Sequence, residues 1–205
     1  MKNYILDVDG TLWDTTEVVA EAWNYALKDL KIEREPITSE ELKSLFGQPM
    51  DIIIKKILRN PCHKDEKEFF NLCRIYESDF LNKTNDYILY PSVVETVKAL
   101  SLNHNLFIVS NCQNGYIELF LNKSNLQDYI IDYECYGNTG KYKAENISLL
   151  IKRNKLTDCA YVGDIESDFQ SSKKVGIPFI YAKYGFGEVE NPDYVIEKFS
   201  DLLKI

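Results

Sequence analysis

Two aspartates, Asp7 and Asp9, stand one residue apart at the end of a short apolar run, directly before Gly10. The run at residues 4–6, continued by Val8, is typical of a strand buried on both faces, where an ionised carboxylate is costly unless it is paired or holds a metal. Side chains alternate along an extended chain, so both carboxylates point to one side, and Gly10 permits a sharp turn there. The pair predicts a divalent cation site, with an acidic Asp-Gly turn as the alternative.

Polar residues also follow two other predicted strands, and two lysines precede a predicted helix. They are Ser110 and Asn111 after the strand 106–109, Asp164 after the strand 160–162, and Lys141 and Lys143 before the helix near 145–153. Parallel strands bind ligands beyond their carboxyl ends, so we expect these groups at one edge of a sheet. Together they supply what phosphoryl transfer requires: a carboxylate nucleophile, an acid–base carboxylate, a hydroxyl and an ammonium for the phosphoryl oxygens, and acidic ligands for Mg²⁺.

Strand and helix alternate along most of the chain that must position these residues. The remaining predicted strands lie near 130–135 and at 179–181, the remaining helices near 116–121 and 167–175, and a last strand and helix fall within 194–203. A capping box from Ser92 to Glu95 opens a helix that runs to about residue 102. Such alternation predicts an α/β fold with a doubly wound, Rossmann-like parallel sheet.

One long segment breaks this alternation. Apolar residues recur at helical spacing from residue 15 to about residue 85, with a capping box at Thr38 to Glu41 and a break at 47–49. The segment is too long for a single crossover helix and has enough apolar surface for a small helical bundle. We therefore expect an α/β core of residues 1–14 and 88–205, with an inserted all-helical domain at 15–87.

Composition narrows the class of protein. The formal net charge of −8, without a cluster of basic residues, disfavours nucleic acid as a partner. No apolar run approaches the ~20 residues of a membrane span, and Asp7 interrupts the N-terminal apolar stretch, so neither a membrane partner nor a secretory signal is expected. The five cysteines form no Cys-x-x-Cys pattern, which indicates neither a disulfide framework nor a zinc site. We expect a cytoplasmic protein.

The order of these motifs resembles the haloacid dehalogenase superfamily. Asp7-Val8-Asp9-Gly10-Thr11-Leu12 looks like its first motif, Ser110-Asn111 like its second, a lysine of 141–143 like its third, and Gly163-Asp164-Ile165-Glu166-Ser167-Asp168 like its fourth. The resemblance spans almost the whole chain. Within the superfamily the chain is most similar to phosphatases of the phosphoglycolate-phosphatase-like branch, which carry a helical cap inserted after the first motif. The resemblance implies that the α/β core is catalytic and that the inserted helical domain is a cap.

The resemblance implies a role for each acidic residue. Asp7 would attack phosphorus and form an aspartyl-phosphate, and Asp9 would protonate the leaving alcohol and then deprotonate the hydrolysing water. Mg²⁺ would be bound by the carboxylates of Asp7 and Asp164 and by the backbone carbonyl of Asp9. Asp168 would act through water or by orienting the lysine, with a carboxylate at a helix N-terminus as the alternative.

The resemblance also implies the phosphate-binding residues. Ser110 and the amide of Asn111 would hydrogen-bond phosphoryl oxygens, and Lys143, favoured over Lys141, would neutralise developing charge. The proline that usually follows this lysine in the family is replaced by Ala144.

Two short segments are expected to bear on the substrate. Gly47 and Gln48 lie in a segment that looks like the cap loop of phosphoglycolate-phosphatase-like members, which varies with substrate. Trp13 follows the first motif and either lines the pocket or packs at the cap hinge, and hinge packing is favoured. A capped site has limited room, so the expected substrate is a small phosphorylated metabolite, such as phosphoglycolate or a sugar phosphate.

Other functions share part of this pattern. Dehalogenating members resemble this fold but lack a carboxylate at the position of Asp9. A β-phosphoglucomutase-like sugar-phosphate mutase shares every core motif and differs in its cap contacts. A phosphorylatable receiver domain also combines acidic residues, a hydroxyl residue and a lysine, but it needs only ~120 residues and no helical insertion. The substrate, and whether the chain is a monomer or a homodimer, cannot be deduced from the sequence.

Overall fold

A computed structural model of the chain describes residues 1–59, 63–84 and 88–205. The chain forms two compact units: a core unit of Met1–Asp14 and Asp86–Ile205, and a helical unit of Thr15–Asn85. The sequence predicts that the chain returns to the core between residues 87 and 88. This boundary borders residues 85–87, which lie outside the described residues.

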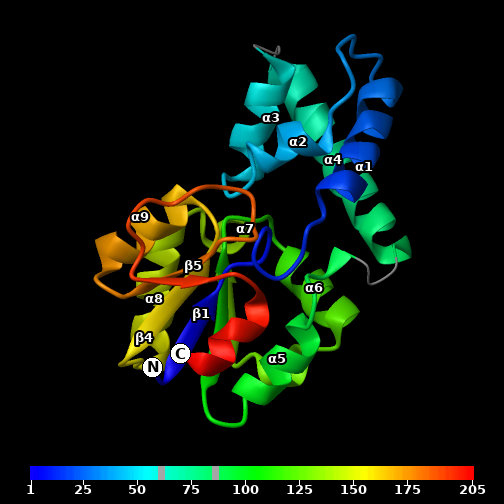
Figure 1. Cartoon of the computed structure of the whole chain (residues 1–205). Helices are drawn as coiled ribbons and strands as arrows, with labels where there is room; N and C mark the ends of the chain where they lie inside the picture. The colour runs from blue at the N-terminus through cyan, green and yellow to red at the C-terminus, as the bar shows by residue number, and fades with distance from the viewer. Residues whose placement is uncertain (60–62, 85–87) are drawn as a thin grey trace. The chain divides into compact units, whose positions relative to one another are not determined.

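The core unit is built on one parallel sheet. Its strands are β1 (Asn3–Leu6), β2 (Asn105–Ser110), β3 (Asp132–Cys135), β4 (Cys159–Gly163), β5 (Phe179–Ala182) and β6 (Tyr194–Ile196). They run in the order β3-β2-β1-β4-β5-β6, and every neighbouring pair is parallel (Figure 1). β1 lies in the interior of the sheet, where Ile5 is in register with Phe107 on one side and Tyr161 on the other. The predicted doubly wound α/β fold is confirmed.

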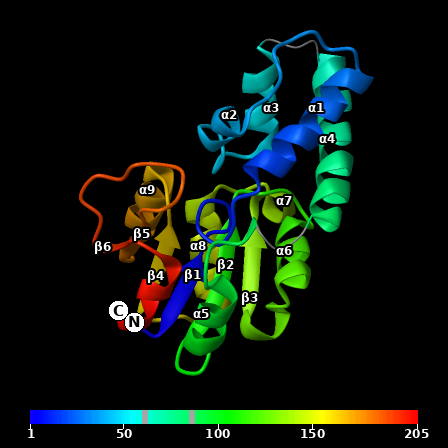
Figure 2. The same cartoon turned by 45° about the vertical axis from the view of Figure 1, so that its right-hand side comes forward.

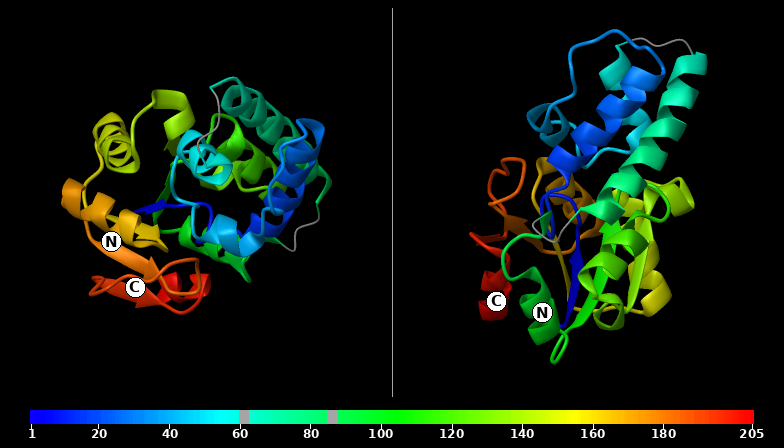
Figure 3. Two further views of the ribbon diagram at one scale, coloured as in Figure 1. Left: turned by 90° about the horizontal axis from the view of Figure 1, so that it is seen from above. Right: turned by 90° about the vertical axis from the view of Figure 1, so that its right-hand side faces the viewer.

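Helices cover both faces of this sheet. They are α5 (Val93–Leu100), α6 (Tyr116–Ser124), α7 (Tyr136–Thr139), α8 (Lys143–Asn154) and α9 (Glu166–Val175), with 3₁₀ turns at η2 (Gln127–Tyr129) and η3 (Phe199–Lys204). α8 and α9 pack together on one face, and α5 and η3 lie on the other (Figure 2 and Figure 3). Ile5 and Phe107 of the sheet pack with Ile147 of α8 and Phe169 of α9. Because both faces are covered, the interior strands β1, β2 and β4 are largely apolar, which explains their continuous apolar runs.

Two local predictions are wrong. Ser92 lies in the left-handed region, with φ of 62°, and its side chain makes no capping bond, so α5 begins without the predicted capping box. The amide of Val93 donates to the carbonyl of Tyr90 instead, so a turn enters this helix. The final predicted helix is the 3₁₀ turn Phe199–Lys204, the tighter form that short terminal segments often adopt.

The helical unit has its own apolar core. It comprises α1 (Thr16–Asp29), α2 (Ser39–Lys43), α3 (Met50–Leu58) and α4 (His63–Lys83). α1 and α4 pack side by side, and Trp23 of α1, Ile54 of α3 and Phe69 of α4 belong to one buried cluster. The Thr38 hydroxyl accepts the amide of Glu41 at 3.1 Å, which is half of the predicted capping box. In the part of the chain that the structure describes, no helix is long and apolar enough to cross a membrane.

Candidate active site

Three neighbouring strands deliver the predicted acidic and hydroxyl residues to one sheet edge. Asp7 directly follows β1, Ser110 ends β2, and Asp164 directly follows β4. Pairing continues past β1, because the amide of Asp7 donates to the carbonyl of Val162 at 2.9 Å. The order β2-β1-β4 therefore places Asp7 between the other two strand ends, at the ligand-binding edge of a parallel sheet.

A cluster of three buried carboxylates lies at this edge. Asp7, Asp164 and Asp168 each offer an oxygen within 4.8 Å of the others. Asp168 comes from the first turn of α9, and its Oδ2 accepts the amide of Asp164 at 3.1 Å. Burial, reinforced by the charges of Asp168 and Asp7, raises the pKa of Asp164 well above its usual range. The cluster is thus electrostatically unfavourable by itself and needs positive charge.

Lys143 supplies part of that charge. It is the first residue of α8, it is buried, and its Nζ donates to Asp7 Oδ2 at 2.7 Å and to Asp168 Oδ1. Burial alone would lower the pKa of Lys143, but the carboxylates of Asp168 and Asp7 raise it above its usual value. Lys141, by contrast, is exposed in the preceding turn. The structure therefore brings Lys143, and not Lys141, to the carboxylates.

The ion pair with Lys143 does not fully offset the burial of the Asp7 carboxylate. Burial raises the pKa of Asp7 to about 7, with the charge of Lys143 opposing the shift and that of Asp168 adding to it. Its Oδ1 is buried and has no hydrogen-bond partner among the described residues. A buried polar atom without a partner costs about 1–3 kcal/mol and calls for an explanation such as a bound ion. An unpartnered carboxylate oxygen beside two further carboxylates fits a hard divalent cation.

A loop after β5 holds Asp164 in place. The amide of Phe186 donates to Asp164 Oδ2 at 2.8 Å. Gly185 passes so close that an added Cβ would lie 2.3 Å from the Cβ of Asp164, so only glycine fits. The hydroxyl of Tyr184 donates to the carbonyl of Thr11 at 2.8 Å, which ties this loop to the first motif. These residues were not predicted from the sequence, because a loop amide leaves no signal in residue type or spacing.

The side chain of Asp9 is held separately from the cluster. Its Oδ1 accepts hydrogen bonds from Trp13 Nε1 at 2.9 Å and from the Tyr116 hydroxyl at 2.7 Å. Trp13, expected to pack at a hinge, is fully buried and contacts Tyr116 and Phe120 edge-on. Tyr116 was not identified from the sequence, because it lies far along the chain from Asp9.

The second motif closes the site beside β1. Ser110 and Asn111 are both buried where β2 ends. The loop that follows is fixed to the neighbouring strand end, since the amide of Gly137 donates to the carbonyl of Cys112 at 3.0 Å. These two residues therefore lie at the same sheet edge as Asp7.

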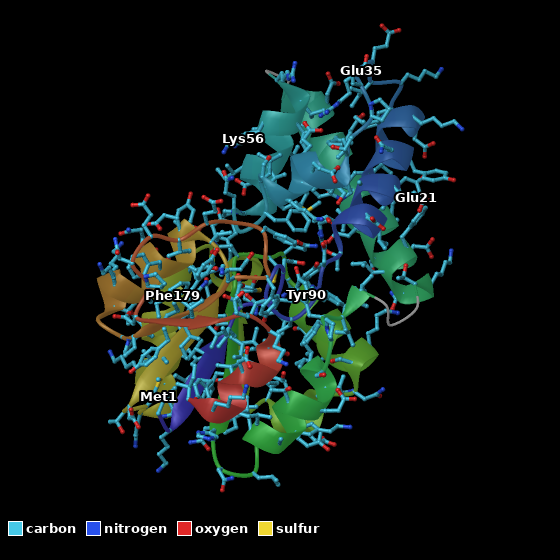
Figure 4. All side chains as sticks on the ribbon, viewed as in Figure 1. Met1, Glu21, Glu35, Lys56, Tyr90 and Phe179 are labelled. Atoms are coloured by element: carbon cyan, nitrogen blue, oxygen red, sulfur yellow. The ribbon has the colours of Figure 1, made fainter. Side chains whose placement is uncertain are left out.

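The two predicted loop residues of the helical unit are held within that unit. Gly47 has a φ of +85°, a left-handed conformation that favours glycine. Gln48 donates through Nε2 to the carbonyl of Leu45 at 3.1 Å and accepts at Oε1 from Lys56 Nζ at 2.6 Å (Lys56 is labelled in Figure 4). Their contact with a substrate stays a prediction.

Known proteins share both the sequence pattern and the fold. The pattern of the family described as haloacid dehalogenase-like hydrolase matches residues 4–182. The chain is 26% identical over 227 residues to a phosphoglycolate phosphatase of Vibrio vulnificus (strain YJ016), covering 100% of this chain and 96% of that protein. It is 24% identical over 212 residues to a phosphoglycolate phosphatase of Aquifex aeolicus (strain VF5), with coverages of 100% and 96%.

Solved structures share the fold of this chain. The crystal structure of a predicted phosphoglycolate phosphatase from Haemophilus somnus 129PT superposes with a TM-score of 0.88 at 22% identity, covering 100% of this chain and 97% of that one. A hydrolase of the haloacid dehalogenase-like family from Streptococcus pneumoniae gives a TM-score of 0.82 at 19% identity, with the same coverages. With the motifs in order at the strand ends and the family pattern matching most of its length, the chain belongs to the haloacid dehalogenase-like hydrolase family.

Proposed function

We propose that this hydrolase is a Mg²⁺-dependent phosphatase of small phosphorylated metabolites, such as phosphoglycolate or a sugar phosphate, that acts through an aspartyl-phosphate. The observation that carries the proposal is the 2.7 Å bond from Lys143 Nζ to Asp7 Oδ2 in a buried acidic cluster. A carboxylate nucleophile beside a buried ammonium suits an anionic phosphoryl group. The relatives from V. vulnificus and A. aeolicus, both named phosphoglycolate phosphatase, support the substrate class.

The carboxylates of Asp7 and Asp164 and the backbone carbonyl of Asp9 would hold Mg²⁺. The support is the unpartnered Oδ1 of Asp7 together with the close approach of Asp164. When bound, the cation supplies Lewis-acid polarisation of the phosphoryl group and neutralises its charge. Asp168 serves differently, because its carboxylate accepts from Lys143 and from the amide of Asp164 and so orients both.

The residues of this chain carry the two chemical steps. Asp7 forms a bond to phosphorus as the bond to the leaving oxygen breaks, and Asp9 gives its proton to that oxygen. Asp9 then takes a proton from water, which attacks phosphorus and releases phosphate from Asp7. Ser110 and the Asn111 amide donate to the phosphoryl oxygens, and Lys143 balances their charge.

The proposal is tested with p-nitrophenyl phosphate and phosphoglycolate as substrates. Chelation with EDTA should abolish turnover, and Mg²⁺ should restore it. Asp7→Asn should lower the rate by about three powers of ten or more, since it removes the nucleophile. Brief incubation of the native enzyme with substrate, acid quenching and mass spectrometry should find one phosphoryl group on the peptide that contains Asp7. The proposal would be refuted if Asp7→Asn kept a tenth or more of the native rate, or if the enzyme remained fully active in EDTA.

The same experiments separate a phosphatase from the alternatives. A sugar-phosphate mutase would convert β-glucose 1-phosphate into an isomeric phosphate and release little inorganic phosphate. A receiver domain would consume at most one equivalent of phosphoryl donor. A panel of about fifty phosphorylated metabolites, scored by released phosphate, then ranks the substrates by kcat/KM.

A further inference from the structure

We infer that Tyr116 and Trp13 are positioning residues for Asp9, which hold its Oδ1 so that Oδ2 exchanges the proton with the leaving group and with water. The inference deepens the proposed function and rests on the acid–base role of Asp9. It concerns two residues outside the motifs that identify the family.

The geometry converges on one atom. Trp13 Nε1 lies 2.9 Å and the Tyr116 hydroxyl 2.7 Å from Asp9 Oδ1. Both distances are those of well-formed hydrogen bonds. Trp13 lies in the turn that follows Asp9, whereas Tyr116 lies 107 residues away along the chain, so the tertiary fold brings the second donor to this oxygen.

Both donors are rigid. Trp13 and Tyr116 are buried, and their ring centroids lie 5.4 Å apart in an edge-on arrangement. The ring of Phe120, which lies on α6 with Tyr116, packs edge-on against Trp13 with a centroid distance of 5.0 Å. Trp13 is also fixed through its backbone, because its carbonyl accepts the amide of Gly10 at 2.9 Å. Aromatic rings that pack together and also hydrogen-bond a carboxyl group have little freedom to change rotamer, so they restrain the position of that carboxyl group.

The two donors lie on the same oxygen of Asp9. An indole N–H only donates, so Oδ1 accepts from Trp13, and it also accepts from the Tyr116 hydroxyl. Because both donors lie on Oδ1, we assign the proton exchange to Oδ2. The same oxygen thereby serves as acid in the first step and as base in the second.

Removing the Tyr116 hydroxyl tests this inference. Tyr116→Phe should lower kcat about tenfold on an alkyl phosphate, a part of the 10²–10⁴ that general acid–base catalysis supplies, with KM unchanged. On p-nitrophenyl phosphate, whose leaving group needs little protonation, phosphoryl transfer to Asp7 should slow less than about twofold in a single turnover. In an Asp9→Asn background the same substitution should cost nothing further, because its effect runs through Asp9.

Tyr76→Phe is the matched control. The Tyr76 hydroxyl also donates to an aspartate carboxylate, that of Asp29, but within the helical unit. Its removal should leave kcat unchanged on both substrates. Equal losses on the two substrates with Tyr116→Phe, or a full further loss in the Asp9→Asn background, would show a merely structural role and overturn the inference.

A spectroscopic readout does not depend on turnover or on the fold of the tyrosine variant. The chain contains two tryptophans, so ¹⁵N-labelled protein has two indole N–H resonances. Asp9→Asn should shift the indole resonance of Trp13. The indole resonance of Trp23, which donates to Glu77, should not move. No shift at Trp13 would overturn the inference. If Asp9→Asn itself costs the same on good and poor leaving groups, the acid–base role fails instead, which is a failure of the proposed function.

Discussion

Each unit of the molecule contains one tryptophan that donates a hydrogen bond to one carboxylate, and we propose that the two pairs have different roles. In the helical unit Trp23 Nε1 donates to Glu77 Oε2 at 2.9 Å, and both residues are buried in an apolar bundle. In the core unit Trp13 Nε1 donates to Asp9 at the same distance of 2.9 Å, but Asp9 is only partly buried at the strand ends. The bond is alike in both places, so its surroundings decide whether it stabilises a fold or orients a reactive group.

The charge around the two pairs differs as well. The core unit gathers Asp7, Asp164 and Asp168 within 4.8 Å, and the described ion pairs of this cluster all run to Lys143. An acidic excess of this kind opposes folding and is relieved by a cation or by protonation. In the helical unit Glu77 is buried and accepts the indole N–H of Trp23, which belongs to an apolar cluster. The unfavourable charge is therefore concentrated where we propose chemistry.

The largest effect on this contrast should come from Lys143→Met. The substitution keeps the unbranched stem of the side chain and removes the ammonium, so two buried carboxylates lose their ion pair. We expect the free energy of unfolding to fall by about 3–5 kcal/mol in the absence of Mg²⁺, and kcat to fall about 10²–10³-fold in its presence. Urea denaturation and steady-state kinetics measure the two quantities. Lys141 is exposed and lies two residues earlier, so Lys141→Met should change neither the stability nor kcat. Comparable losses in both variants would contradict the assignment of Lys143 to the site.

A pH dependence should follow from Asp7 in metal-free protein. The pKa of Asp7 is raised from 3.8 to about 7, so the folded state holds this proton more tightly than the unfolded state. Its contribution to stability is therefore greatest below pH 4 and is lost as the pH rises to about 7. In EDTA, the Tm of Asp7→Asn minus that of the native protein should grow between pH 5 and pH 8, and Mg²⁺ should reduce this difference. A constant difference across that range would contradict the expectation.

Replacing each tryptophan separates stability from activity. Trp23→Phe removes a donor from the buried Glu77 and should lower the free energy of unfolding by about 2 kcal/mol, while kcat of the folded enzyme stays within about twofold. Trp13→Phe should instead lower kcat on an alkyl phosphate about tenfold. Urea denaturation and kinetics on both variants test the pair. If Trp23→Phe lowers kcat as much as Trp13→Phe, the division between the two units is wrong.

The smallest effect, and the one that would join the units in function, concerns Gln48. We expect Gln48→Ala to lower kcat/KM for the preferred substrate about tenfold and that for p-nitrophenyl phosphate less than twofold, because a contact to the leaving group is lost while the phosphate site is unchanged. Asn82→Ala, which removes an exposed amide from α4, is the control. Equal loss on both substrates, or none, would show that this loop does not select the substrate.

Much of the fold could be predicted because the signals are local. Continuous apolar runs such as 106–109 indicate strands buried on both faces, and helical spacing indicates the bundle between residues 15 and 85. The errors fell where backbone conformation overrides composition. Ser92 has the residue type of an N-cap but adopts a left-handed conformation, and the last segment winds as a 3₁₀ turn.

The sequence by itself determined which residue types stand at the ends of β1, β2 and β4, since strand periodicity and topology send them to one edge whatever the details of packing. Only the tertiary structure decided their partners: Lys143 rather than Lys141 on Asp7, the Phe186 amide on Asp164, and Tyr116 on Asp9. Order along a chain fixes which strand end a residue occupies. A hydrogen bond between segments far apart in sequence depends on how helices and loops pack, and no local pattern records that.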